Sequence, residues 1–137
     1  IKDSFSKVKD QFVGEYADWA DSSAKIKSLY EKTGYVIDTH TAVAAASYDK
    51  YVKATGDTTK TVIASTASPF KFARSVMKAI DPVYAGEDDF KLIDILSKTA
   101  NVDIPNAINE IRTSPVVHDT VVEISDMKKA VMDNIGI

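Results

Sequence analysis

A run of hydroxyl residues that leads into a helix start is the first feature of this sequence that could carry chemistry. Residues 61–65 are rich in β-branched side chains, and Thr66, Ser68 and Pro69 follow them. Open α/β sheets place ligands where a strand turns into a helix, so these hydroxyl groups are candidates for ligand binding. A simpler interpretation stays open, in which Ser68 caps the helix, Pro69 is its first residue and the two phenylalanines that follow belong to the core.

A second polar group stands in a loop that leads into an alanine-rich segment. It contains Asp38, His40 and Thr41. A carboxylate, an imidazole and a hydroxyl so close together can transfer protons or bind an anion. The alternative is that Asp38 or Thr39 caps the helix and that His40 is a partly buried polar residue. His118 is far away in the sequence, without paired carboxylates at ligand spacing, so we expect no metal site.

Apolar residues at helical spacing dominate the chain, so we expect a mostly α-helical structure. Small side chains in the alanine-rich helix should let it lie close against a neighbour. A short helix through Phe5, Val8 and Phe12 should open the chain. The further helices that the spacing predicts are 22–33, 40–54, 70–80, 87–100, one from 105 and one from 125.

The sequence predicts one main strand, at about 61–65. This run is apolar on both faces, which is typical of a strand inside a sheet. Val116-Val117 and Val121-Val122 are possible short extended segments. An interior strand needs neighbours on both sides, and the chain offers no other long strand. We therefore expect residues 1–137 to be a single unit that forms the carboxy-terminal piece of a larger protein, in keeping with a first residue that is Ile.

The composition excludes several classes of protein. The net charge of -3 and the lack of a basic cluster with interleaved aromatic residues argue against nucleic-acid binding. No apolar run approaches the length of a membrane span, and no signal peptide is visible. The chain has no cysteine, which fits a reducing compartment. We expect a cytoplasmic protein.

Three segments together resemble the threonine synthase family of pyridoxal-phosphate enzymes: FVGEYAD (12–18), GYVIDTHTAVA (34–44) and TVIASTASPFKF (61–72). The resemblance extends to the final helix and matches the carboxy-terminal portion of the long bacterial and fungal form. The sequence departs from the family pattern at two positions. Thr39 stands where the family usually has Pro, and Ser68 stands where many relatives have His.

The resemblance implies a parent fold of the α/β class, like that of tryptophan synthase β, with two open domains and pyridoxal 5'-phosphate between them. The lysine that binds this cofactor covalently and the glycine-rich phosphate loop would lie upstream, so no catalytic residue is expected in this chain. Thr66 would bind the cofactor by meeting its pyridine nitrogen. Four further residues are candidates for contacting the substrate or for supporting the residues that contact it: Asp38, His40, Thr41 and Lys71.

The implied reaction converts O-phospho-L-homoserine and water to L-threonine and phosphate. A hydroxyl can donate to an unprotonated pyridine nitrogen but cannot stabilise a pyridinium as a carboxylate would, which favours elimination and addition over transamination. The isolated chain should be inactive. Two alternatives stay open: a dehydratase-like lyase of the same fold, and a non-enzymatic helical interaction domain. The expected partners are the rest of the same polypeptide and, for the chain alone, a second copy that covers the exposed strand.

Overall fold

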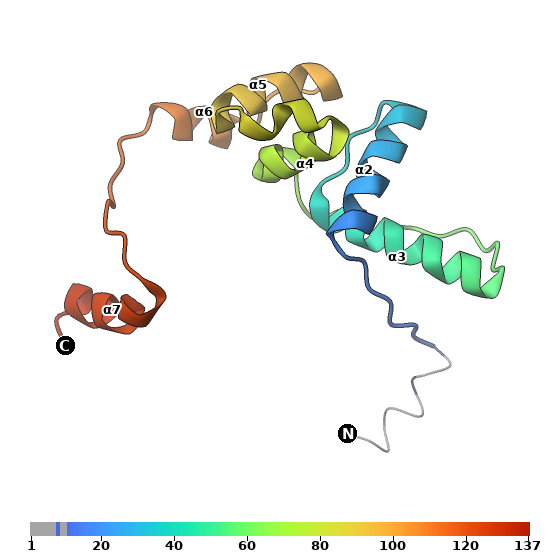
Figure 1. Cartoon of the computed structure of the whole chain (residues 1–137), viewed down its shortest axis with the longest axis horizontal. Coiled ribbons are helices and arrows are strands. Elements are labelled where there is room, and N and C mark those ends of the chain that lie inside the picture. Colours follow the sequence, from blue (N-terminus) through green and yellow to red (C-terminus); the bar gives the residue numbers. More distant parts are fainter. Residues whose placement is uncertain (1–7, 9–10) are drawn as a thin grey trace.

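The computed structural model describes residue 8 and residues 11–137, and within them the chain is helical with no β-strand (Figure 1). The opening helix that the sequence predicts falls largely on residues outside this described part. The α-helices are α2 (Trp19–Thr33), α3 (Thr39–Thr55), α4 (Ala73–Ile80), α5 (Asp89–Ala100), α6 (Asn106–Thr113) and α7 (Met127–Ile135). Three short 3-10 helices join them: η1 (Pro69–Phe72), η2 (Pro82–Gly86) and η3 (Ile124–Asp126).

Local capping signals decide where the first two described helices begin and end. Asp18 caps α2, since its carboxylate accepts the Asp21 amide at 2.9 Å and the Asp21 carboxylate accepts the Asp18 amide at 3.2 Å. This capping box starts α2 at Trp19, three residues before the predicted start. Gly34 and Gly56 end α2 and α3 in the left-handed conformation, with φ of 73° and 72°. A residue without Cβ adopts that conformation at little cost.

The core forms where α2 packs on α3 and α4, and α4 packs on α5. The buried face of α3 carries mainly small side chains, which permits the close approach that the alanine-rich sequence predicted. Two ion pairs also link α2 to α3: Lys25 with Asp49 at 2.6 Å, and Asp21 with Lys50 at 2.7 Å. The largest fully buried apolar side chains are Ile26, Val76, Met77, Leu92 and Leu96.

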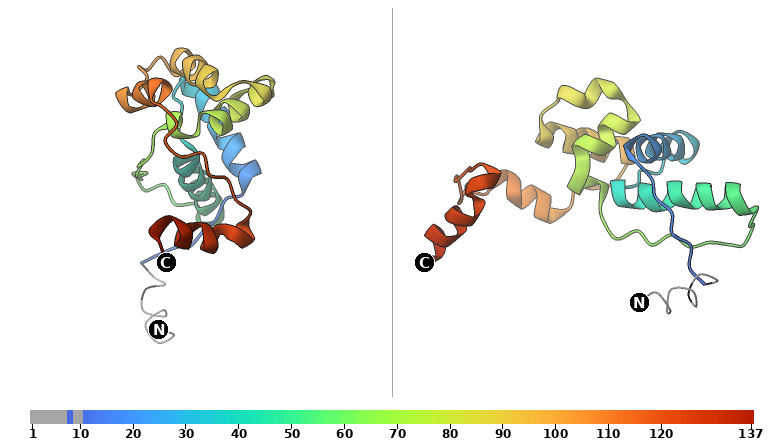
Figure 2. Two further views of the ribbon diagram at one scale, coloured as in Figure 1. Left: turned by 90° about the vertical axis from the view of Figure 1, so that its left-hand side faces the viewer. Right: turned by 60° about the horizontal axis from the view of Figure 1, so that its bottom comes forward.

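The prediction of a strand at 61–65 is wrong. These residues belong to a non-helical segment that runs back alongside α3 and leads into η1 (Figures 1 and 2). Val62 in this segment is 94% exposed. A β-branched run becomes a strand only when neighbouring strands pair with its backbone and cover its side chains. No described residue supplies such a neighbour, so the segment stays unpaired.

The carboxy-terminal part continues away from the core. The segment between α6 and η3 is neither helix nor strand, so the short extended stretches expected there form no ladder. Val116, Val117 and Val121 in it are 85%, 81% and 93% exposed. It carries α7 to the far end of the molecule (Figure 1). None of the described helices is both long and apolar enough to cross a lipid bilayer.

Candidate functional site

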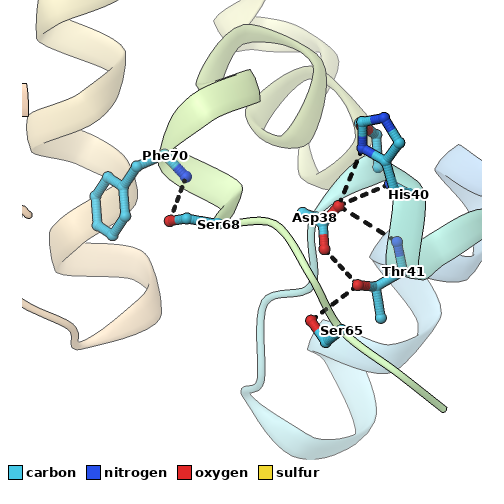
Figure 3. Close-up of polar contacts among 7 residues, drawn as sticks. Asp38, His40, Thr41, Ser65, Ser68 and Phe70 are labelled. Carbon is cyan, nitrogen blue, oxygen red and sulfur yellow. Dashed lines mark hydrogen bonds and ion pairs between the residues drawn. The ribbon is translucent and has the colours of Figure 1, made fainter.

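Asp38 is the centre of a hydrogen-bond network at the start of α3 (Figure 3). Its Oδ1 accepts the backbone N–H of His40 at 2.8 Å and that of Thr41 at 3.3 Å. Its Oδ2 accepts the Thr41 hydroxyl. Asp38 is fully buried, with 0% of its surface exposed. Of the two caps that the sequence left open, Asp38 and Thr39, the structure has Asp38, a buried carboxylate that accepts several donors.

The surroundings of Asp38 favour its charged form. Burial raises the pKa of this carboxyl, but the hydrogen bonds from the Thr41 hydroxyl, from the two amides and from the His40 ring together outweigh burial. The pKa of Asp38 therefore lies below its usual range. Donors that point at a carboxylate stabilise the anion and not the neutral acid. The structure thus holds a buried negative charge at the positive end of α3.

The Thr41 hydroxyl connects α3 to the returning segment. Its Oγ1 lies 2.9 Å from the Oγ of Ser65 (Figure 3). A hydroxyl has one proton to donate, and the Asp38 carboxylate can only accept, so Thr41 donates to Asp38 and accepts from Ser65. The network therefore fixes Ser65 beside the start of α3, and Thr66 follows directly.

His40 lies at the edge of this network. Its Nδ1 is 3.3 Å from Asp38 Oδ1, and its ring centroid is 4.9 Å from that of Phe72, at an interplanar angle of 52°. The side chain is 65% exposed, so the interpretation of His40 as a partly buried residue is wrong. The contact with Phe72 was not expected, because the sequence assigned that ring to the core. No periodicity links a residue at the start of one helix to an aromatic residue so far along the chain.

The start of η1 follows the simpler interpretation of its sequence. Ser68 caps it, with its hydroxyl accepting the Phe70 amide at 3.3 Å, and Pro69 is its first residue (Figure 3). Phe70 is a core residue, 4% exposed. Lys71 is exposed, and its Nζ lies 5.7 Å from the centroid of the Phe72 ring.

Thr66 is exposed between Ser65 and Ser68. Its hydroxyl takes part in none of the hydrogen bonds among the described side chains, so it is free to donate to a ligand. The other candidates fall into two groups. Asp38 contacts both Thr41 and His40. Lys71 contacts none of these three, but its Nζ and the His40 ring both lie near the Phe72 ring.

His118 lies elsewhere, in the exposed segment before α7. Together with residues of α7 it lines a shallow hollow at the far end of the molecule. No group of three or more metal-binding side chains occurs among the described residues. The polar groups that could act together are therefore those at the start of α3 and around η1.

Comparison with known proteins places these residues in a family. The family described as threonine synthase, C-terminal, matches residues 41–131, which include Thr41, Ser65, Thr66 and Lys71. Relatives named threonine synthase-like 1 are 35% identical in Homo sapiens and Mus musculus and 34% in Macaca fascicularis, each over 74 residues. That alignment covers 54% of this chain and 10% of each relative's length. The chain belongs to the threonine synthase C-terminal family.

Proposed function

We propose that this chain is the carboxy-terminal part of a pyridoxal-phosphate-dependent threonine synthase, a carbon–oxygen lyase that acts on O-phospho-L-homoserine. Membership of the family supports this reaction. One observation supports the contribution of the chain itself: the Thr41–Ser65 hydrogen bond fixes the residue before the exposed Thr66 at the start of α3, where the Thr41 hydroxyl also binds the buried Asp38 carboxylate. An exposed hydroxyl that can donate therefore follows directly after a residue that this network holds in place.

Thr66 fits one contact of pyridoxal phosphate, the one with its ring nitrogen. The hydroxyl is exposed and can donate, and an unprotonated pyridine nitrogen accepts. The phosphate end of the cofactor has no matching cradle here, because the five glycines of the chain stand singly, at 14, 34, 56, 86 and 136. Under this proposal a glycine-rich loop and the lysine that binds the cofactor come from the rest of the polypeptide.

The proposed reaction sets distinct tasks for the residues of this chain. Pyridoxal phosphate, when bound, supplies an electron sink for the charge that develops as protons leave the substrate carbons. Thr66 orients the ring by its hydrogen bond and leaves the nitrogen without a full positive charge. Asp38 holds His40 by Nδ1, and the exposed ring can hold or release a proton. Overall, the Cγ–O bond breaks and phosphate leaves, Cβ loses one proton and gains the hydroxyl of water, Cγ gains one proton, and the remaining proton of water goes to the released phosphate.

The test is a product assay on the full-length protein with pyridoxal phosphate. O-phospho-L-homoserine should yield threonine and phosphate in equal amounts. Conversion of threonine to 2-oxobutanoate and ammonia, without action on the phosphate ester, would favour the dehydratase-like lyase. A protein that turns over neither substrate would contradict the proposal and leave the helical interaction domain as the better interpretation.

A further inference from the structure

Two basic side chains from different elements meet the same aromatic ring beside the network. His40 belongs to α3 and Lys71 to η1, and both lie against Phe72, with centroid distances of 4.9 Å for the imidazole and 5.7 Å for the ammonium nitrogen. Both side chains are exposed. The Phe72 ring is thus a common neighbour of two exposed side chains that can carry positive charge.

Lys71 differs from several other lysines in its surroundings. Lys25, Lys50 and Lys91 each lie within 2.7 Å of a carboxylate oxygen. Lys71 makes no such ion pair within the described part of the chain, and its ammonium lies near an apolar ring instead. Its charge is therefore free to meet an anion from solution.

The Asp38 contact fixes which nitrogen of His40 faces outward. Nδ1 lies 3.3 Å from Asp38 Oδ1 and 3.5 Å from the Thr39 hydroxyl, so this nitrogen faces the start of α3. Nε2 is on the opposite side of the ring. When the ring holds both protons, Nε2 becomes a directional donor. Asp38 is then a positioning residue, because it acts on a ligand only through His40.

We propose that His40 and Lys71, arranged by Phe72, form a binding site for a phosphate monoester, here called the His40–Lys71 clamp. A phosphate monoester dianion offers two charges and three terminal oxygens, which match a compact ammonium and a fixed imidazole donor. The clamp rests on the proposed function only for its natural ligand, which would be the phosphate group of O-phosphohomoserine or the phosphate that the reaction releases.

The 137-residue chain itself provides a direct test, because it has two histidines, His40 and His118. Proton NMR of their Cε1–H signals is recorded during titration with inorganic phosphate, with sodium chloride at equal ionic strength as reference. The His40 signal should shift in a saturable way while the His118 signal stays in place. Equal and non-saturating shifts of both signals would overturn the clamp.

Matched variants decide whether both cations take part. His40→Gln and Lys71→Gln should each weaken phosphate binding about two- to fivefold, the range for a solvent-exposed charge pair. His118→Gln and Lys98→Gln remove an equivalent exposed group elsewhere and should leave the affinity unchanged. Circular dichroism checks that all four variants keep their helices. Equal losses in Lys71→Gln and Lys98→Gln would show only general charge attraction and would contradict the clamp.

Experiments on the full-length protein separate the clamp from the proposed function. If it converts O-phosphohomoserine, Lys71→Gln should raise KM about two- to fivefold, as for phosphate binding, and Lys98→Gln should not change it. Normal KM values in both His40→Gln and Lys71→Gln would overturn the clamp and keep the function. Phosphate binding at His40 in a protein that does not turn over this substrate would keep the clamp and overturn the function.

Tighter binding of O-phosphohomoserine than of inorganic phosphate would identify the substrate as the ligand, and equal binding would identify released phosphate.

Discussion

The hydroxyl of Thr41 lies 2.9 Å from the hydroxyl of Ser65, a residue 24 positions further along the chain. The same Thr41 hydroxyl donates to the buried carboxylate of Asp38. A continuous series of hydrogen bonds therefore runs from the cap of α3 to the residue before Thr66. The position of Thr66, the proposed cofactor contact, therefore depends on the cap of a helix far from it in the sequence.

Replacement of Asp38 by Ala should destabilise the chain more than loss of an ordinary cap. The change leaves the amides of His40 and Thr41 and the Thr41 hydroxyl without an acceptor in a buried place. We expect a loss of about 2 kcal/mol in the free energy of unfolding, the upper end for a cap residue. The matched control is Asp88→Ala, which removes the exposed cap of α5 and should cost about 1 kcal/mol. Urea unfolding measures both, and equal losses would contradict the special role of Asp38.

Acid should destabilise the chain through two carboxylates. The pKa of Asp38 lies below its usual range, and hydrogen bonds from the side chain and backbone of Thr59 and from Tyr51 lower the pKa of Asp57 from 3.8 to about 2. A lowered folded-state pKa stabilises the fold above the unfolded-state value, and that stability is lost as pH falls through the folded-state value. The urea midpoint should therefore decline below about pH 4 and continue to fall toward pH 2. Asp57→Asn should flatten this decline, and an unchanged slope in that variant would contradict the assignment.

Thr66→Val in the full-length enzyme should keep the fold and lower turnover. The substitution exchanges a hydroxyl for a methyl group of similar volume and removes the donor to the pyridine nitrogen. A hydrogen bond of this kind contributes about 1 kcal/mol, and more when its partner is left buried and unpaired. We expect kcat to fall at least about fivefold. Thr66→Ser keeps the hydroxyl and should keep most of the activity, and a Thr66→Val enzyme with normal kcat would refute the cofactor contact.

The isolated chain should not bind pyridoxal phosphate covalently at a defined residue. Lys71 stands beside the site, but its ammonium lies near the Phe72 ring at the exposed surface, and the family resemblance assigns the covalent lysine to an upstream position. Borohydride reduction after incubation with the cofactor, followed by mass measurement of peptides, checks this. A stoichiometric pyridoxyl adduct on Lys71 would overturn the expectation, while traces spread over many lysines would not.

We propose that the chain on its own pairs with a second copy through residues 61–65. This segment is non-helical and largely exposed, and Val62 is 94% exposed, so its backbone and apolar side chains can pair with another chain. Light scattering should detect dimers at micromolar concentration, and Val62→Lys should return the chain to monomers because a lysine disfavours edge pairing. A monomer at high concentration, with the amides of 61–65 protected from hydrogen exchange, would contradict the proposal.

The sequence by itself determined the helices and several of their ends. Apolar spacing predicted the α-helices α2 to α7 within a few residues, because α-helices depend on contacts three and four positions apart; it did not predict the 3-10 helix η2. The same holds for Asp38 as the cap of α3, Gly34 as the end of α2, and Ser68 with Pro69 as the start of η1. The sequence also drew attention to Asp38, His40 and Thr41, which do lie together, since they are neighbours in one helical turn.

Only the tertiary structure decided how distant parts meet. The β-branched run at 61–65 predicted a strand, but a strand needs partner strands, and the described residues supply none. Two contacts join residues that are far apart in the sequence and that no helical or strand periodicity relates: Thr41 with Ser65, and His40 with Phe72. The burial of Asp38 likewise could not be read from the sequence. These contacts arise because the chain turns back after α3 and packs α4 against α2, so that the start of α3, the returning segment and η1 come together.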